Sequence, residues 1–263
     1  REVSVPLVLS AHGNAITLSN QLPAEHIGDG SGLAPFLKHR WQLQRPPTLA
    51  AAHRFSSHHI LLHSWLRRHG LEPGRDVEIV FLPPPLMPAS LAAGHIDGYC
   101  VGEPWNSEAI LKGDGWCPVT SSELSTGHPE KILIVDGQMV GERRDEVVAM
   151  GSALLHACRL CQDPEFREEL VSILARPEYT GCSETTLYNS LGPSFVSGRG
   201  KLDASNFHLF YGDDLNQPTA EKASWFLAGM RGTGMLPETT TAPLTRLYRQ
   251  DLFQASKKAL LPA

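Results

Sequence analysis

Several features that would assign this chain of 263 residues to a common functional class are missing from its sequence. The net charge is -5 and the pI about 6.2, which excludes the clustered Lys and Arg of a nucleic-acid-binding surface. No apolar run reaches the roughly 20 residues of a membrane-spanning helix. The opening stretch Arg1–Leu9 lacks the pattern of a signal peptide and is typical of a strand.

Catalytic and metal-binding motifs are also missing. The chain has no G-x-S-x-G, H-E-x-x-H or G-x-x-x-x-G-K-[ST] sequence, so it predicts no enzyme and no cofactor. Its five cysteines are an odd number, which excludes a disulfide framework, and Cys158 and Cys161 fit the buried face of a helix. His59 and His63 lie four residues apart without a carboxylate at helical spacing, so no metal site is predicted.

The first half of the chain alternates between strand and helix patterns. Short apolar runs predict five strands, at Val5–Leu9, Thr48–Ala52, Val77–Leu82, Ile96–Val101 and Ile132–Val135. Between them, Ser57–His69 has helical period and ends at Gly70, and a second helix follows Pro83-Pro84-Pro85 and ends at Gly94. This alternation is typical of an α/β protein with mostly parallel sheets.

The second half is mostly helical. Helices are predicted over Glu146–Cys161, after Asp163-Pro164, from about Thr219 to Gly232, and from about Leu244 to Phe253. The stretches Glu184–Phe210 and Gly232–Thr241 are predicted as turns and loops. The glycine-rich segment 28–32 follows no clear strand, so we interpret it as a connection rather than a nucleotide-binding loop.

Three predicted strands are followed by small, amide or hydrogen-bond-donating residues. Gly13 and Asn14 follow the first strand, Ser56-Ser57-His58 opens the helix after the second, and Gly102-Glu103 follows Ile96–Val101. A capped helix N-terminus with a nearby imidazole can bind an anion, and ligands of open α/β sheets bind where strands end. Helix capping alone would also explain each of these features separately.

Several motifs resemble the nitrate- and bicarbonate-binding protein family over nearly the whole chain. They are Leu9–Ser19 (LSAHGNAITLS), Phe55–His58 (FSSH), the triple proline with Met87, Ile96–Asn106 (IDGYCVGEPWN), His128–Leu133 (HPEKIL), and the segments around Cys158–Cys161 and Ala175–Tyr179. The resemblance implies a fold like the type II periplasmic-binding proteins, with two α/β lobes, a ligand cleft and a helical C-terminal part. It places residues 1–20 and 126–263 in lobe I and residues 21–125 in lobe II.

The resemblance also implies a set of ligand-binding residues. Asn14 matches the family's cleft amide, His58 its imidazole and Lys131 its cation, with Gly102 and Glu103 as further candidates. Lysine at the position of Lys131 accompanies nitrate in the family, whereas glutamate there accompanies bicarbonate. Nitrate has only acceptor oxygens and suits donors, while bicarbonate brings an O–H that needs an acceptor. We therefore expect nitrate or nitrite, with bicarbonate as the alternative.

Two kinds of partner follow from the resemblance. The family includes periplasmic receptors that feed an ABC transporter permease, and a cytoplasmic branch that senses nitrate and restrains an antiterminator protein. The sequence does not decide between these locations. The family pattern begins upstream of Val5 with roughly another hundred residues of lobe I, so this chain is expected to expose a sheet edge and to self-associate.

Overall fold

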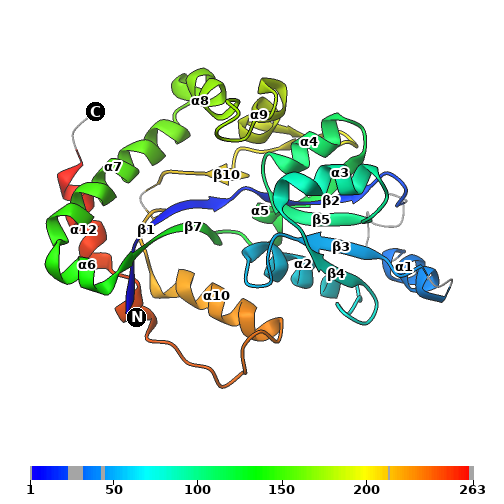
Figure 1. The fold of residues 1–263 in the computed structure, drawn as a ribbon, viewed down its shortest axis with the longest axis horizontal. Coiled ribbons are helices and arrows are strands. Elements are labelled where there is room, and N and C mark those ends of the chain that lie inside the picture. The colour runs from blue at the N-terminus through cyan, green and yellow to red at the C-terminus, as the bar shows by residue number, and fades with distance from the viewer. Residues whose placement is uncertain (1, 23–31, 43–44, 213, 261–263) are drawn as a thin grey trace. The chain divides into compact units, whose positions relative to one another are not determined.

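The structure is a computed structural model that describes residues 2–22, 32–42, 45–212 and 214–260 (Figure 1). The predicted glycine-rich connection therefore lies outside the described residues, apart from Gly32. Two compact units make up the chain. Unit 1 comprises Arg1–His12, Gly127–Leu170 and His208–Ala263, and unit 2 comprises Gly13–Thr126 and Val171–Phe207.

This division differs from the expected one mainly in two segments, because residues 13–20 and 171–207 belong to unit 2. The reason for the first segment is that strand β2 (Asn14–Ser19) lies in the middle of the sheet of unit 2, between two other strands. The second segment contains helix α9 (Glu184–Leu191), which packs on helix α4 (Trp105–Leu111) of that unit.

Unit 2 is built on a mixed five-stranded sheet in the order β4-β3-β5-β2-β6. Its other strands are β3 (Thr48–Ala51), β4 (Glu78–Phe81), β5 (Gly98–Gly102) and β6 (Gly115–Thr120). Strand β3 is parallel to β4 and β5, since helices α2 (Ser57–Arg68) and α3 (Met87–Ala92) return the chain between them. Strand β2 is antiparallel to β5 and β6. The expectation of mostly parallel strands thus holds only for β3, β4 and β5.

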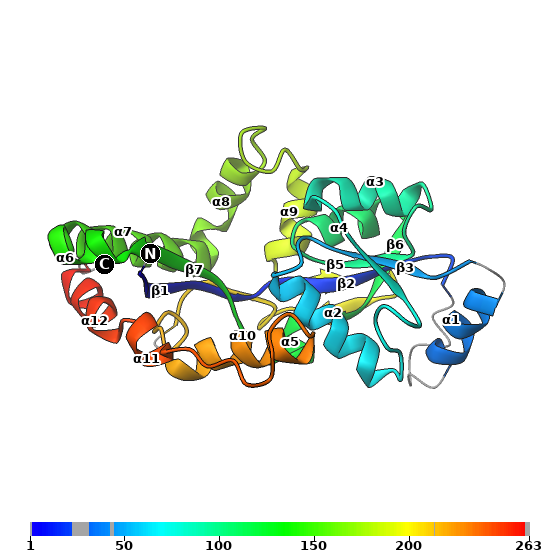
Figure 2. The same cartoon turned by 60° about the horizontal axis from the view of Figure 1, so that its bottom comes forward.

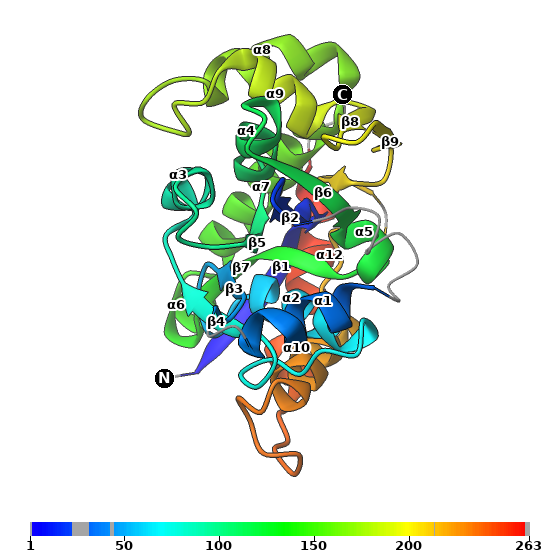
Figure 3. The same ribbon diagram turned by 90° about the vertical axis from the view of Figure 1, so that its right-hand side faces the viewer.

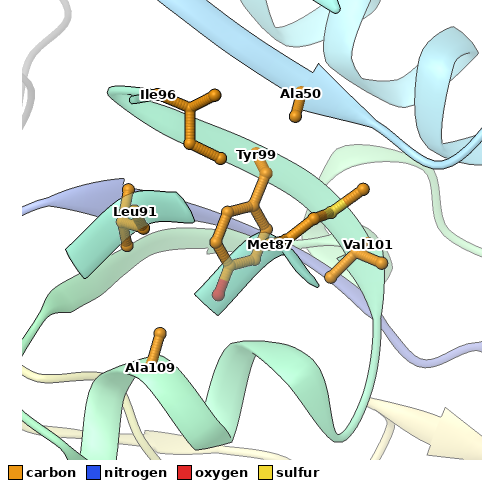
Figure 4. Close-up of a cluster of buried hydrophobic side chains, with 7 residues drawn as sticks. All are labelled: Ala50, Met87, Leu91, Ile96, Tyr99, Val101 and Ala109. Atoms are coloured by element: carbon orange, nitrogen blue, oxygen red, sulfur yellow. The ribbon is translucent and has the colours of Figure 1, made fainter. Parts of the chain in front are cut away.

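Helices cover both faces of this sheet, and α4 and α2 lie on opposite sides of β2 and β5 (Figure 3). On the α4 side, Tyr99 is the centre of a buried cluster with Met87, Leu91 and Ala109, and its hydroxyl donates to the carbonyl of Trp105 at 2.8 Å (Figure 4). Met87 follows the short helix η2 (Pro84–Leu86), so the triple proline sets the start of α3.

The remaining elements of unit 2 include several that the sequence did not predict. They are α1 (Leu33–Gln42), α5 (Ser121–Leu124), β8 (Ser194–Val196) and β9 (Lys201–Asp203), together with β2, β6 and α9. The prediction of loops over Glu184–Phe210 was wrong for α9. Ser183 caps this helix by accepting the N–H of Thr186 at 3.2 Å, and Leu187 and Leu191 bury its inner face.

Unit 1 contains an antiparallel three-stranded sheet in the order β10-β1-β7. Its strands are β1 (Val3–His12), β7 (Pro129–Asp136) and β10 (His208–Leu209), and its helices are α6 (Gly137–Glu142), α7 (Arg144–Gln162), η3 (Pro164–Phe166), α10 (Ala220–Gly232), α11 (Leu244–Leu247) and α12 (Gln250–Ala259). Helix α8 (Arg167–Leu174) contains the boundary between the units at Leu170.

The two faces of the β1–β7 pair are covered by different helices (Figure 2). Leu7 packs with residues of α7 and α12, whereas Val5 packs with residues of α10 and α11. Strand β10 meets β1 only at Ala11 and His12, and the Asn216 side chain extends this edge by donating to the carbonyl of Val8 at 2.9 Å. None of the described helices is long and apolar enough to cross a membrane.

The cysteines are free thiols. Cys158 faces the sheet of unit 1 and donates to the carbonyl of Leu9 at 3.4 Å, and burial raises its pKa to about 11. Burial also raises the pKa of Cys117, Cys161 and Cys182. The C-x-x-C pair thus lies on α7 as small, mostly buried side chains, as the helical pattern predicted.

Candidate functional site

Asn14 and Gly102 face each other where β2 begins and β5 ends, because the antiparallel register pairs these two residues. Asn14 is fully buried, and its backbone N–H donates to Ser121 Oγ at 3.1 Å. A methyl group added at Gly102 would lie 3.2 Å from Asn14 Oδ1 and 3.8 Å from His58 Nε2. The backbone of Gly102 therefore lies close to both an amide and an imidazole, where a side chain would crowd Asn14.

His58 reaches this position from the first turn of α2. Ser56 caps the helix, since its Oγ accepts the N–H of His59 at 3.3 Å. The imidazole of His58 is only 8% exposed. The positive end of a twelve-residue helix favours a negative charge, and a histidine in its first turn adds a side-chain donor. Asn14, His58 and Gly102 thus form a polar group at one end of the central strands of the sheet of unit 2.

Glu103 follows directly, but its side chain serves packing between helices. Its Oε2 accepts the hydroxyl of Ser190 at 2.7 Å and the N–H of Ser107 at 3.3 Å, so the carboxylate joins α4 to α9. Burial raises its pKa, and these hydrogen bonds oppose that shift. Its backbone N–H donates to the carbonyl of Gly13 at 2.9 Å, which fixes the turn after Gly102. Glu103 contributes to the group through its backbone.

Asn106 from the same motif is also structural. Its amide donates to the carbonyl of Val101 at 2.8 Å and its Oδ1 accepts the hydroxyl of Thr17 at 2.8 Å. It is fully buried, and it ties α4 to both β2 and β5. The conspicuous G-E-P-W-N run therefore positions Gly102 mainly by holding the loop that follows it.

Lys131 lies in unit 1, on β7, and not in unit 2 with the other four predicted residues. Its Nζ lies 2.6 Å from Glu130 Oε1, and the lysine side chain is 63% exposed while that of Glu130 is 5% exposed. Neighbouring residues of a regular strand point to opposite faces. The contact arises because the β1–β7 ladder is irregular on both sides of the Ser10–Lys131 pair.

Three histidines at this end of the sheet were not predicted as site residues, namely the buried His12 and His128 and the partly buried His208. His12 and His128 have ring centroids 5.1 Å apart, and His128 also stacks on Trp225 at 4.9 Å. His12 Nε2 accepts the N–H of Gly127 at 2.7 Å, and His12 pairs with His208 between β1 and β10. Burial lowers the pKa of His208 to about 4, so this imidazole is neutral at pH 7. In the sequence, the sole feature that could have pointed to these three histidines is their position at or next to the end of a strand.

The structure offers no metal centre within the ranges that it describes, where no three His, Cys, Asp or Glu side chains are grouped to hold an ion. His59 and His63 do lie together, with ring centroids 4.4 Å apart and nearly perpendicular planes. Burial lowers the pKa of both, that of His63 to about 4, and His59 Nδ1 lies 2.8 Å from the carbonyl of Arg54. Such a pair packs as two neutral rings.

Solved structures with a similar fold include solute-binding proteins. The periplasmic nitrate-binding protein NrtA from Synechocystis PCC 6803 has a solved structure that matches with a TM-score of 0.87 and 25% identity, over 98% of this chain and 68% of that chain. The fold class is therefore that of the type II periplasmic-binding proteins, as predicted.

Sequence comparison gives the family. Residues 1–175 match the model of the NMT1-like family, and the chain belongs to that family. It is 34% identical to the nitrate import ATP-binding protein NrtC of Synechocystis, over 94% of this chain and 37% of that protein. It is 32% identical to the bicarbonate transport ATP-binding protein CmpC of the same organism, over 99% of this chain and 40% of that protein. The expected resemblance to nitrate- and bicarbonate-binding proteins is confirmed.

The chain spans only about two fifths of the length of these two relatives. Their names refer to ATP, yet this sequence contains no phosphate-binding G-x-x-x-x-G-K-[ST] loop.

Proposed function

We propose that this chain binds nitrate or nitrite as the solute-binding part of an ABC-type importer. The observation that carries the proposal is the group formed by Asn14, His58 and Gly102 at the N-terminus of α2. The similarity to proteins named for nitrate binding and nitrate import supports it. No catalytic role is assigned, because the group contains neither a nucleophile nor a base next to one.

The chemistry of the group suits a small planar anion. The imidazole of His58 can donate one hydrogen bond, and the helix end adds a favourable field for negative charge. The Oδ1 of Asn14 faces Gly102, so its amide donates to an anion there only when the NH2 group is turned toward the ligand. Glu103 Oε2 accepts hydrogen bonds from Ser107 and Ser190, so this oxygen is directed to α4 and α9. Hydrogen bonds to a charged ligand contribute about 1.5–3 kcal/mol each, which is enough to select anions over neutral solutes.

Bicarbonate is the second candidate, and the similarity to a bicarbonate transport protein favours it specifically. Nitrate is preferred here because Lys131 can only donate hydrogen bonds, whereas the O–H of bicarbonate needs an acceptor. A glutamate at this position would supply that acceptor. The residue at 131 is therefore proposed to decide between the two anions.

The test is a calorimetric titration of the chain with nitrate, nitrite, bicarbonate and sulfate at constant ionic strength. We expect saturable nitrate binding that is lost in His58→Leu and in Lys131→Glu. The exposed residues His95 and Lys258 provide matched controls, and His95→Leu and Lys258→Glu should bind like the unchanged chain. Saturable binding of bicarbonate without binding of nitrate would identify bicarbonate as the ligand. No binding of any anion would refute the proposal.

A separate experiment distinguishes the two proposed protein partners, a membrane permease and an antiterminator protein. The alternative that the chain senses nitrate and restrains an antiterminator protein predicts a complex that nitrate dissociates, whereas a receptor for an importer predicts one with a membrane permease. Pull-down with each purified partner, with and without nitrate, distinguishes the two. Self-association stays a prediction, which light scattering at increasing protein concentration would check.

A further inference from the structure

Glu130 and Lys131 form an unusual pair for two neighbouring residues of one strand. Their side chains would point to opposite faces of a regular strand, but here Lys131 Nζ lies 2.6 Å from Glu130 Oε1. The ladder between β1 and β7 shifts register on both sides of the Ser10–Lys131 pair. Such bulges turn side chains away from their regular directions, and they are often found beside functional sites. The bulge in the ladder thus brings the carboxylate of Glu130 next to the ammonium of Lys131.

The two partners of the pair have very different environments. The Glu130 side chain is 5% exposed, so its carboxylate is held in place by the surrounding protein, whereas the Lys131 side chain is 63% exposed. An exposed lysine is ordinarily free to take many conformations, and holding it costs side-chain entropy. A buried, fixed acceptor at 2.6 Å removes much of that freedom. Lys131 therefore presents its remaining N–H groups to solvent from a defined position.

The pair also changes the charge of its surroundings. Glu130 offsets the charge of Lys131. The charges of both residues also act on the imidazole of His208, which is neutral at pH 7. His12 pairs with His208 in the sheet, and it accepts a backbone N–H through Nε2. Arg167 is the further cation that acts on His208. An anion that approaches Lys131 thus meets an ammonium whose charge is offset by Glu130.

From these contacts we infer that Glu130 is a positioning residue with two effects. It holds the Lys131 ammonium in one position, and by offsetting its charge it makes the site prefer singly charged anions over doubly charged ones. This inference rests on the proposed function, since it assumes that Lys131 contacts the ligand. A monoanion such as nitrate needs donors at fixed positions and little net charge. A dianion such as sulfate gains twice as much from an uncompensated lysine, and Glu130 removes that advantage.

The experiment compares Glu130→Gln with Glu130→Asp in titrations with nitrate and sulfate at constant ionic strength. Glutamine keeps an oxygen that can accept from Lys131 but removes the charge. We expect the ratio of sulfate to nitrate affinity to rise by about ten-fold or more, since a unit charge several ångströms away changes affinity by about that factor. Aspartate keeps the charge but shortens the reach, so we expect weaker nitrate binding with an unchanged ratio.

Two controls separate this role from a structural one. In a Lys131→Met background, Glu130→Gln should no longer raise the ratio, because no ammonium remains to be neutralised. Circular dichroism melting identifies a variant that fails to fold, and the aspartate variant then still tests the positioning. An unchanged ratio in folded Glu130→Gln, or a change that persists without Lys131, overturns the inference while the proposed function stands. A wild-type chain that binds no anion overturns both.

Discussion

Replacing Gly102 by alanine tests the candidate site with the smallest possible change. Gly102 is not among the glycines with a left-handed φ, so alanine can adopt its backbone conformation. The added methyl group would lie 3.2 Å from Asn14 Oδ1, which is tighter than an ordinary contact, and 3.8 Å from His58 Nε2. It would fill the space between the amide and the imidazole, and a shift of a few tenths of an ångström in Asn14 would accommodate it.

The cost for folding and the cost for binding should therefore differ widely. We expect the free energy of unfolding to fall by no more than about 1–2 kcal/mol, as for a tight but adjustable overpacking. An anion excluded from one or both donors loses about 1.5–3 kcal/mol for each hydrogen bond. Nitrate affinity should thus fall by about ten-fold for one lost hydrogen bond and about 100-fold or more for two.

Calorimetry gives the affinity, and urea denaturation of the same samples gives the stability. Gly141 is the matched control, because a Cβ there meets nothing within 4 Å and its φ is not left-handed. Gly141→Ala should bind nitrate like the unchanged chain. A folded Gly102→Ala variant that keeps nitrate affinity within about three-fold of wild type would refute the placement of the ligand between Asn14 and His58.

Three further predictions concern stability. Glu103→Ala should lower the free energy of unfolding by about 2–4 kcal/mol, because the Ser190 hydroxyl and the Ser107 N–H lose a buried acceptor. The pKa of His208 is lowered to about 4, so the unfolded chain binds a proton there below pH 6.5 while the folded chain does not; this residue should lower stability by about 2 kcal/mol between pH 7.5 and 5, beside a similar contribution from His63, and urea denaturation measures the total. Asn216→Ala should cost about 2–4 kcal/mol, because its amide holds three backbone groups at 2.8–3.2 Å.

Each of these predictions has its own control. Glu103→Gln retains an acceptor and should cost much less than Glu103→Ala. His208→Gln removes one titrating group and leaves His63, so it should reduce the fall in stability over this pH range by about 2 kcal/mol, and an unchanged slope would contradict the assignment. Asn20 makes a single exposed hydrogen bond to the carbonyl of Gly113, and Asn20→Ala should cost well under the value for Asn216→Ala.

The regular part of the fold could be predicted because its residues follow simple periods. Strands β3, β4 and β5 and helices α2 and α3 have apolar runs bounded by Gly70, Gly94 and the triple proline. Strand β6 was missed because its sequence, with Gly115, Pro118 and no alternation, resembles a turn. Its conformation comes from pairing with β2, which no local pattern encodes.

The candidate site divides in the same way. Asn14, His58 and Gly102 could be brought together in advance because each follows a predicted strand, His58 in the first turn of the helix after it. The role of Glu103 could not, since its partner Ser190 lies 87 residues away on a helix that was predicted as a loop. The Glu130–Lys131 contact depends on a bulge, and a bulge reverses the two-residue alternation on which strand predictions depend.

The state of the cysteines has a practical consequence for measuring ligand binding by fluorescence. Maleimides and iodoacetamides react with the thiolate, and a thiol with a pKa of about 11, such as Cys158, is ionised in only about one molecule in ten thousand at pH 7. The raised pKa values of Cys117, Cys161 and Cys182 slow their labelling in the same sense. Cys100 is only 1% exposed, so a reagent reaches it poorly as well. A single new cysteine at an exposed position should therefore be labelled faster than the native thiols, and its dye provides a second assay for the proposed anion binding.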